Sequence, residues 1–140
     1  MISGLFSSIL LTAYLLTTVN NTPEGISALE VVETLKSNLT CVWRSETVDT
    51  FKSGDPKDIV SGIACTFTAS IDVLKEAVEK NCNLVITHEP TFYNHFDSPD
   101  AFQNDPVYRE KLKFIEDNDL IVFRFHDHWH MTHPDAIYVG

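Results

Sequence analysis

The sequence predicts an α/β domain with a parallel or mixed sheet flanked by helices, and two observations support this fold class. From Ile59 onward, short apolar segments rich in β-branched residues alternate with segments whose apolar residues recur at helical spacing. The resulting order, β-α-β-α-β, implies neighbouring parallel strands joined by right-handed crossovers. The chain has 140 residues, of which 44% are hydrophobic, so it can build a core but at most one domain.

The first half of this domain is expected to form a helix, a loop and a strand. Ser27-Ala-Leu-Glu30 has the spacing of a capping box, which predicts a helix over about 28–38. Residues 44–58 are polar and contain a Gly-Asp-Pro turn, so we expect a loop. Residues 59–67 are apolar and β-branched, which predicts a buried strand with Cys65 as a small buried hydrophobic residue.

The second half continues the alternation. A helix is expected over 70–81, with a serine that can cap its first turn, and a strand over 84–86. A loop of about 17 residues follows. The next helix is expected over 105–118, because Asp-Pro is a cap followed by a proline at the first helical position. Residues 120–125 are expected to form the last strand.

The first 23 residues carry no charged side chain. Within them, residues 5–16 form an apolar stretch that is too short for a bilayer span but has the length of a secretory signal core. We expect a signal or disordered segment over 1–23 and an α/β metal-binding domain over 24–140. Export to the periplasm or outside the cell is expected in preference to the cytoplasm, with no membrane association after the signal is removed.

The chain is acidic, with a net charge of −10. An acidic surface repels nucleic acid and anionic membranes, and it raises the local concentration of cations. Nucleic-acid binding needs a basic patch, which ten Lys and Arg residues scattered along the chain do not form. We therefore expect a small-molecule substrate and no nucleic-acid partner.

All six histidines lie in two groups, each of which follows a predicted strand. His88 and His95 follow residues 84–86, and the other four follow residues 120–125, namely His126, His128, His130 and His133. Sites in open α/β sheets lie beyond the carboxyl ends of the strands, so both groups are expected at one edge. Imidazole and carboxylate are the usual ligands of zinc, iron and manganese. The two groups therefore predict two halves of one metal site.

Two conformations are open for the second group. An extended chain would place His126, His128 and His130 on one face. A helical turn would pair only His126 with His130, at i,i+4 spacing. His126 and His130 are therefore the firmest predicted ligands, whereas His128 is a neighbour of the ligands, a substrate contact or an exposed residue. His133, which precedes a proline, is expected at the surface.

The first group offers an imidazole next to a carboxylate. In His88-Glu89-Pro90 the proline holds Glu89 in an extended conformation, so the two side chains diverge. Such a pair suits two neighbouring metal ions better than one. Farther along the loop, His95 and Asp97 are an acid/base pair, substrate contacts or surface residues.

These segments carry a family resemblance. Residues 69–90, which end in Thr-His-Glu-Pro, and the strand that leads into His126 resemble the N-terminal half of the Nif-three-like dinuclear metal centre family, also labelled GTP cyclohydrolase type 2-like. The similar region runs from about residue 26 to 140. The resemblance implies one half of a two-lobed fold, homo-oligomers such as hexamers, and two divalent ions (zinc, iron or manganese) as cofactors.

The resemblance also implies a ligand set, which consists of His88, Glu89, His126 and His130. Family members usually have His at the position of Glu89 and Asp at the position of His130. The two departures compensate, because the set keeps three imidazoles and one carboxylate. Members also have a His-x-x-x-Glu pair near the C-terminus, which this sequence lacks, so we expect a chain truncated at its C-terminus.

The expected function is that of a divalent-metal-binding protein with a dinuclear site. The resemblance implies a metal-dependent hydrolase of nucleotide or phosphoester-type substrates. In that role Glu89, Asp127 and His128 are the expected catalytic residues, because each could move a proton. The alternatives are a non-catalytic metal sensor, carrier or assembly protein, and an inactive fragment.

Overall fold

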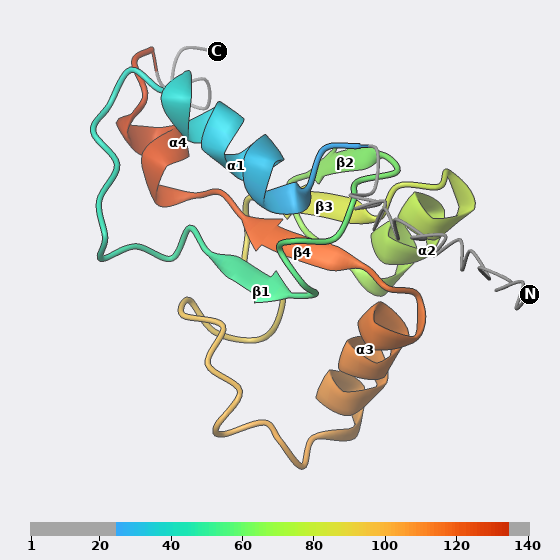
Figure 1. The fold of residues 1–140 in the computed structure, drawn as a ribbon. Helices are drawn as coiled ribbons and strands as arrows, with labels where there is room; N and C mark the ends of the chain where they lie inside the picture. The colour runs from blue at the N-terminus through green and yellow to red at the C-terminus, as the bar shows by residue number, and fades with distance from the viewer. Residues whose placement is uncertain (1–24, 135–140) are drawn as a thin grey trace, which may run out of the picture.

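The computed structural model describes residues 25–134, which form a four-stranded mixed sheet with helices on both faces (Figure 1). The elements follow one another as α1 (Ala28–Ser37), β1 (Phe51–Ser53), β2 (Ile63–Thr66), α2 (Ile71–Glu79), β3 (Leu84–Thr87), α3 (Pro106–Asp117), β4 (Ile121–Arg124) and α4 (Asp127–Met131). The predicted α/β class with a parallel or mixed sheet is confirmed.

The sheet has the strand order β1-β4-β3-β2. β3 lies between two parallel neighbours, with Leu84 in register with both Ile63 of β2 and Ile121 of β4. β1 pairs with β4 in the antiparallel sense, and Phe51 lies opposite Phe123. Because α2 and α3 are the crossovers between the parallel strands, the carboxyl ends of β3 and β4 meet at one edge of the sheet.

The hydrophobic core has one layer on each face of the sheet. Side chains alternate along a strand, so Val85 and Val122 face α2 and α3, whereas Leu84 and Phe123 face α1. The helices complete these layers with Leu74, Ala77 and Ile115 on one face and with Ala28 and Val32 on the other. β4 is buried along its whole length, so the backbone that leads to the second histidine group is fixed by the core.

The first three helices begin at the residues that the sequence predicts. Ser27 and Glu30 form a capping box, in which the Glu30 carboxylate accepts a 2.9 Å bond from the Ser27 backbone N–H. Ser70 caps α2, and Asp105 caps α3 before a proline in the first turn.

The prediction of an uninterrupted loop over 44–58 is wrong, because β1 lies within it. This strand has three residues, too few to show a period-2 pattern in the sequence. Its position is fixed by tertiary contacts instead. Phe51 packs edge-on against Phe123 at a ring separation of 5.0 Å, and the ladder with β4 is irregular between Phe51 and Ser53.

The prediction of a buried strand over 59–67 is also wrong in two respects. β2 is shorter than predicted, since Ile59 forms only an isolated bridge with Ser27. β2 is also an edge strand, with Ile63 46% exposed and Cys65 exposed. Local apolar character shows that a strand forms, but it does not show whether both faces of that strand are covered.

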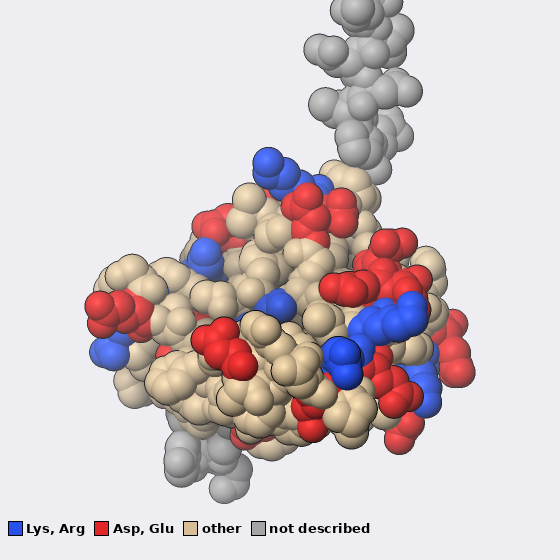
Figure 2. All heavy atoms as spheres, turned by 90° about the horizontal axis from the view of Figure 1, so that it is seen from below, with Lys and Arg blue, Asp and Glu red and all other residues tan. Residues whose placement is uncertain are grey.

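Two surface observations bear on the predicted partners. The predicted signal or disordered segment, 1–23, lies outside the described residues, and no helix within 25–134 is long and apolar enough to cross a membrane. Seen from below (Figure 2), acidic and basic side chains are interspersed, and no continuous basic patch lies on this face of the described part of the chain.

Candidate metal centre

The two histidine groups emerge side by side from the sheet. Thr87 and Arg124, the last residues of β3 and β4, are in register in a parallel pair. His88 follows Thr87 directly, and His126 comes two residues after Arg124. The expectation that the two strands are parallel neighbours with their ends at one edge is therefore confirmed.

The chain turns into a helix directly after His126, which settles the two conformations left open by the sequence. α4 has five residues, and the His130 backbone N–H donates to the His126 carbonyl at 3.2 Å. His126 and His130 therefore pair at i,i+4 spacing, and His128 takes a different direction.

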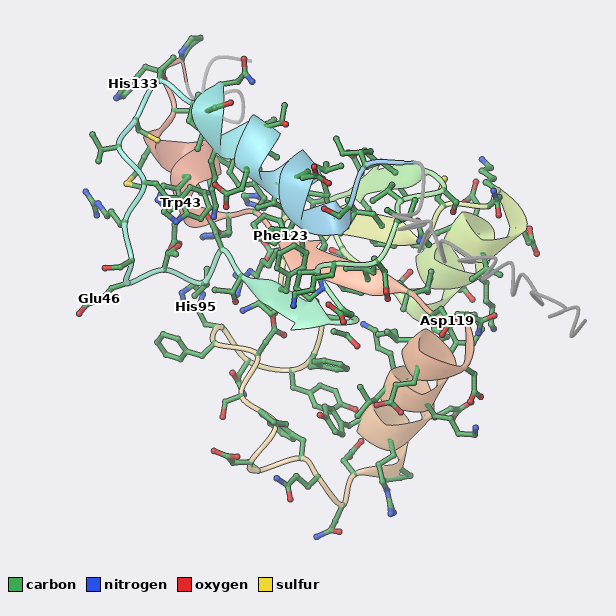
Figure 3. The ribbon with its side chains drawn as sticks, in the orientation of Figure 1. Trp43, Glu46, His95, Asp119, Phe123 and His133 are labelled. Carbon is green, nitrogen blue, oxygen red and sulfur yellow. The ribbon has the colours of Figure 1, made fainter. Side chains whose placement is uncertain are left out.

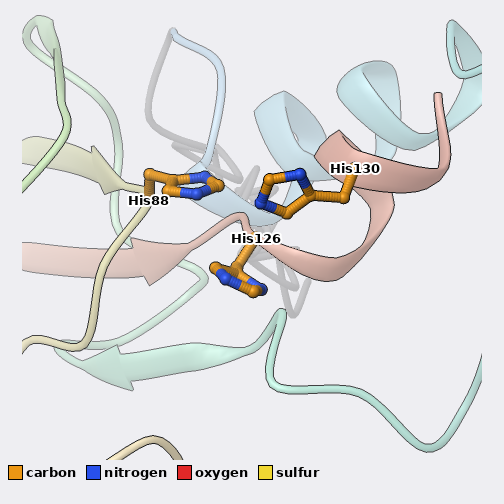
Figure 4. A group of neighbouring side chains, drawn as sticks. All are labelled: His88, His126 and His130. Atoms are coloured by element: carbon orange, nitrogen blue, oxygen red, sulfur yellow. The ribbon is translucent and has the colours of Figure 1, made fainter. Parts of the chain in front are cut away.

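Three imidazoles converge from these elements (Figure 4). One ligand atom from each of His88, His126 and His130 lies within 4.8 Å of the others. The ring centroids are 4.6 Å apart for His88 and His126, 5.0 Å for His88 and His130, and 4.9 Å for His126 and His130. All three residues are partly buried. This group, the histidine cluster, can hold a metal ion.

Hydrogen bonds fix which nitrogen two of these rings present. The Nδ1 atom of His88 lies 3.2 Å from the Phe125 carbonyl oxygen, and Nδ1 of His126 lies 3.0 Å from a carboxylate oxygen of Asp127. A carbonyl or carboxylate oxygen can only accept, so each Nδ1 donates, and in the neutral ring Nε2 carries the lone pair that can bind a metal ion. Such outer partners commonly orient histidine ligands.

Burial and hydrogen bonds favour a neutral imidazole at His88 and an ionised carboxylate at Asp127, and both forms suit a cation site. Burial lowers the pKa of His88 below its ordinary value, and the neighbouring His126 ring lowers it further, so the neutral, ligating imidazole is favoured. Burial alone would raise the pKa of Asp127, but hydrogen bonds from His126, Val48 and Thr47 outweigh it and lower the pKa to about 2. Asp127 is therefore ionised, and its carboxylate accepts a hydrogen bond from Nδ1–H of His126.

Asp49 holds the start of α4, a role that no local pattern in the sequence indicates. One carboxylate oxygen accepts from the backbone N–H groups of His126 and Asp127 at 2.6 and 2.9 Å. The other accepts from the backbone N–H of His128 at 2.8 Å. Asp49 thus supplies the acceptors that the first turn of a helix needs, from a segment 77 residues earlier in the chain.

His128 is a packing residue in this arrangement. Its side chain has no solvent exposure, Nδ1 lies 2.6 Å from Asp49, and Nε2 accepts from the Arg44 backbone N–H at 2.9 Å. Its ring stacks on Trp43, with centroids 3.7 Å apart and planes 7° apart. Figure 3 shows Trp43 beside α4. Since both ring nitrogens are occupied and buried, we do not assign His128 the catalytic role expected from the sequence.

Residues 26–131, which include all three cluster histidines, match the family model described as Duf34/NIF3 (NGG1p interacting factor 3). This chain belongs to the DUF34/NIF3 family. The family resemblance stated from the sequence is confirmed.

Individual relatives of this DUF34/NIF3 chain are longer than it is. A curated relative from Clostridium acetobutylicum, named GTP cyclohydrolase 1 type 2 homolog, is 34% identical over 73 residues, which are 52% of this chain and 26% of that protein. Among solved structures, a Bacillus cereus protein related to NIF3 matches with a TM-score of 0.62 and 18% identity, over 76% of this chain and 29% of that one. Reduced HcgD from Methanocaldococcus jannaschii matches with a TM-score of 0.60 and 17% identity, over 80% and 45%. At these identities the solved structures support the fold.

Glu89 and Asp127 are the two acidic residues expected at the DUF34/NIF3 site, and they lie differently relative to the histidine cluster. The Glu89 carboxylate lies outside the cluster of ligand atoms, while its backbone N–H donates to the Phe67 carbonyl at 2.8 Å. Asp127 lies beside the cluster and holds His126, and its second oxygen accepts from Thr47 at 2.8 Å. Asp127 is therefore placed to orient a ligand, and the role of Glu89 as a fourth ligand stays a prediction.

The loop after β3 does not form the suggested His95–Asp97 pair. Asp97 turns inward, where it accepts from the Phe92 backbone N–H at 2.7 Å, whereas His95 is exposed with its ring 5.7 Å from that of His126. Figure 3 shows the position of His95. The fully buried Arg124 fixes the backbone of this loop, because its guanidinium donates to the carbonyls of His88 and His95.

Two cavities adjoin the histidine cluster. A polar cavity of about 230 Å³ includes His126 and His130 together with Arg44 and Glu46 in its lining. An apolar cavity of about 390 Å³ includes His88 in its lining. The cluster is therefore accessible from spaces of contrasting polarity.

Proposed function

We propose that the histidine cluster binds a divalent metal ion and that this protein is a metal-dependent hydrolase of nucleotide or phosphoester-type substrates. The observation that carries the proposal is the convergence of His88, His126 and His130, whose ligand atoms lie within 4.8 Å of one another. Three protein imidazoles with an open fourth position are the donor set of catalytic zinc sites.

The donor set fits the ions expected from the sequence. Neutral imidazole suits zinc and iron, and manganese accepts it when carboxylate is also present. Glu89, next to His88 in the chain, is the carboxylate that we propose for a second ion. When bound, such ions polarise a substrate oxygen and lower the pKa of water.

The contribution of the chain itself is to hold the imidazoles in place. Asp127 keeps a proton on Nδ1 of His126, and the Phe125 carbonyl does the same for His88. Arg124 fixes the backbone of His88, and Asp49 fixes the start of α4. Because the rings of His88 and His126 and their backbones have partners, the direction in which each ring approaches a cation is constrained.

The name of the Clostridium acetobutylicum relative supports a hydrolytic function for the family. That relative is about four times as long as the aligned segment, so activity of this chain by itself is part of the proposal. Assembly into a homo-oligomer and export from the cytoplasm are proposed from the sequence alone.

Turnover tests the hydrolase proposal. The full chain is loaded with zinc or manganese and assayed on bis(p-nitrophenyl) phosphate, p-nitrophenyl phosphate and GTP, with and without EDTA. We expect hydrolysis that EDTA abolishes and that His126→Ala loses, while His133→Ala, whose histidine is exposed, retains it. Bound metal without turnover on any of these substrates would contradict the hydrolase and favour a metal sensor or carrier.

A further inference from the structure

We propose that the apolar cavity beside His88 binds the aryl or alkyl body of a small ligand, whose oxygen-bearing head group reaches a metal ion at the histidine cluster. The inference rests on the proposed function and narrows its substrate class to esters or phosphoesters with an apolar body. The cavity volume of about 390 Å³ lies in the range of small-molecule sites.

The position of His88 connects this cavity with the cluster. Its imidazole lines the cavity and is also one of the three converging rings. The remaining lining is mainly apolar and includes Leu35 of α1, Phe67 after β2, Ile86 of β3, Phe125 before α4 and Trp129 of α4. A ligand in the cavity therefore lies next to a proposed metal ligand.

The lining has no charged side chain, and its two threonine hydroxyls already donate hydrogen bonds to backbone carbonyls. The Thr66 hydroxyl donates to the Thr68 carbonyl at 3.1 Å. The Thr87 hydroxyl faces the carbonyls of Phe67 and Glu89 at 3.4 and 3.2 Å. A phosphate group placed within this lining would find no cationic side chain, which is costly in an apolar site. The lining therefore favours an apolar body.

Two exposed aromatic side chains border the cavity. Phe67 is 61% exposed and stacks on the His88 ring, with centroids 5.1 Å apart and planes 24° apart. Trp129 is 38% exposed and meets Phe125 edge-on at 5.8 Å. Large exposed apolar groups in a concave site mark a binding surface. We assign a small ligand rather than a second copy of the chain, because a copy seated here would cover His88.

The test compares three hydroxamates that share one metal-binding head group: acetohydroxamate, benzohydroxamate and octanohydroxamate. Each is titrated by calorimetry into the zinc-loaded full chain. We expect benzohydroxamate and octanohydroxamate to bind at least about tenfold more tightly than acetohydroxamate, since burying added carbon in an apolar pocket has roughly that effect or more. GMP should bind more weakly than benzohydroxamate.

Substitutions in the cavity lining test whether the preference for an apolar body arises there. Phe67→Ala and Trp129→Ala should each remove most of the preference for the apolar body, measured on zinc-loaded protein as the ratio of the octanohydroxamate and acetohydroxamate affinities. The matched control is Phe96→Ala, which removes an aromatic side chain that is 74% exposed and outside the lining. It should leave all three affinities unchanged.

Equal affinities for the three hydroxamates on zinc-loaded protein would overturn the assignment of the cavity, but not the metal site. Failure to bind zinc would overturn the proposed function as well. Sedimentation of the same sample provides a further check. If the chain self-associates and Phe67→Asp separates the copies, the cavity is an interface between copies and the small-ligand assignment is wrong.

Discussion

The carboxylate of Asp49 lies 2.6 Å from Nδ1 of His128, and neither side chain has any solvent exposure. The same carboxylate accepts from the backbone N–H groups at the start of α4. The segment before β1 therefore determines where α4 begins, and with it the position of His130. The metal centre thus depends on a residue that contributes no ligand atom to the histidine cluster.

Replacing Asp49 should destabilise the fold, because its buried carboxylate accepts four hydrogen bonds at the start of α4. Asp49→Asn keeps one carbonyl oxygen but puts an NH2 group where the other oxygen accepted, so two buried N–H groups lose their acceptor and we expect the free energy of unfolding to fall by about 3 kcal/mol. Urea denaturation measures this free energy of unfolding. The control is Asp58→Asn, at an exposed position, which should change it by about 0.5 kcal/mol or less. Similar losses in both variants would show that Asp49 does not hold α4.

Asp127 should make the stability depend on acid pH. Its pKa is lowered from 3.8 to about 2, so the folded state binds its proton less readily than the unfolded state. The stabilisation is therefore fully present above pH 3.8 and is lost as the pH falls toward 2. The wild-type free energy of unfolding should fall more steeply in this window than that of Asp127→Asn. Parallel curves for the two proteins would contradict the assigned hydrogen bonds.

Replacing Arg124 should lower both the free energy of unfolding and the affinity for zinc. Arg124→Met leaves the carbonyls of His88 and His95 without their donor, at a cost of about 1–3 kcal/mol for each buried group left unpaired. Zinc affinity should also fall, because the backbone of His88 is no longer fixed. Arg109→Met, at an exposed position of α3, serves as the control and should change neither quantity. Unchanged zinc affinity in Arg124→Met would show that the guanidinium only packs the loop.

Features that depend on neighbouring residues could be predicted from the sequence. The caps at Ser27, Ser70 and Asp105 are local, and so is the apolar alternation that defines β3 and β4. The crossover rule then places the ends of these strands together, and it predicts that His88 and His126 meet.

Features that depend on distant contacts could not be predicted. Asp49 lies in a polar segment without periodicity, and its partners are 77 to 79 residues away. β1 is held by pairing with β4 rather than by a pattern of its own. The choice between a strand and a helix after His126 depends on the caps that Asp49 provides, so the inward direction of His128 was not determined by its neighbours.

A zinc competition titration against a chromophoric chelator at neutral pH tests the central claim most directly. We predict that His88→Ala, His126→Ala and His130→Ala each weaken zinc binding by at least about 100-fold, since loss of even an outer partner costs about 10–100-fold. His133→Ala, which removes an exposed histidine outside the cluster, should bind zinc like the wild type. If the three cluster variants retain the affinity of His133→Ala, the converging imidazoles do not form a metal site and the account is contradicted.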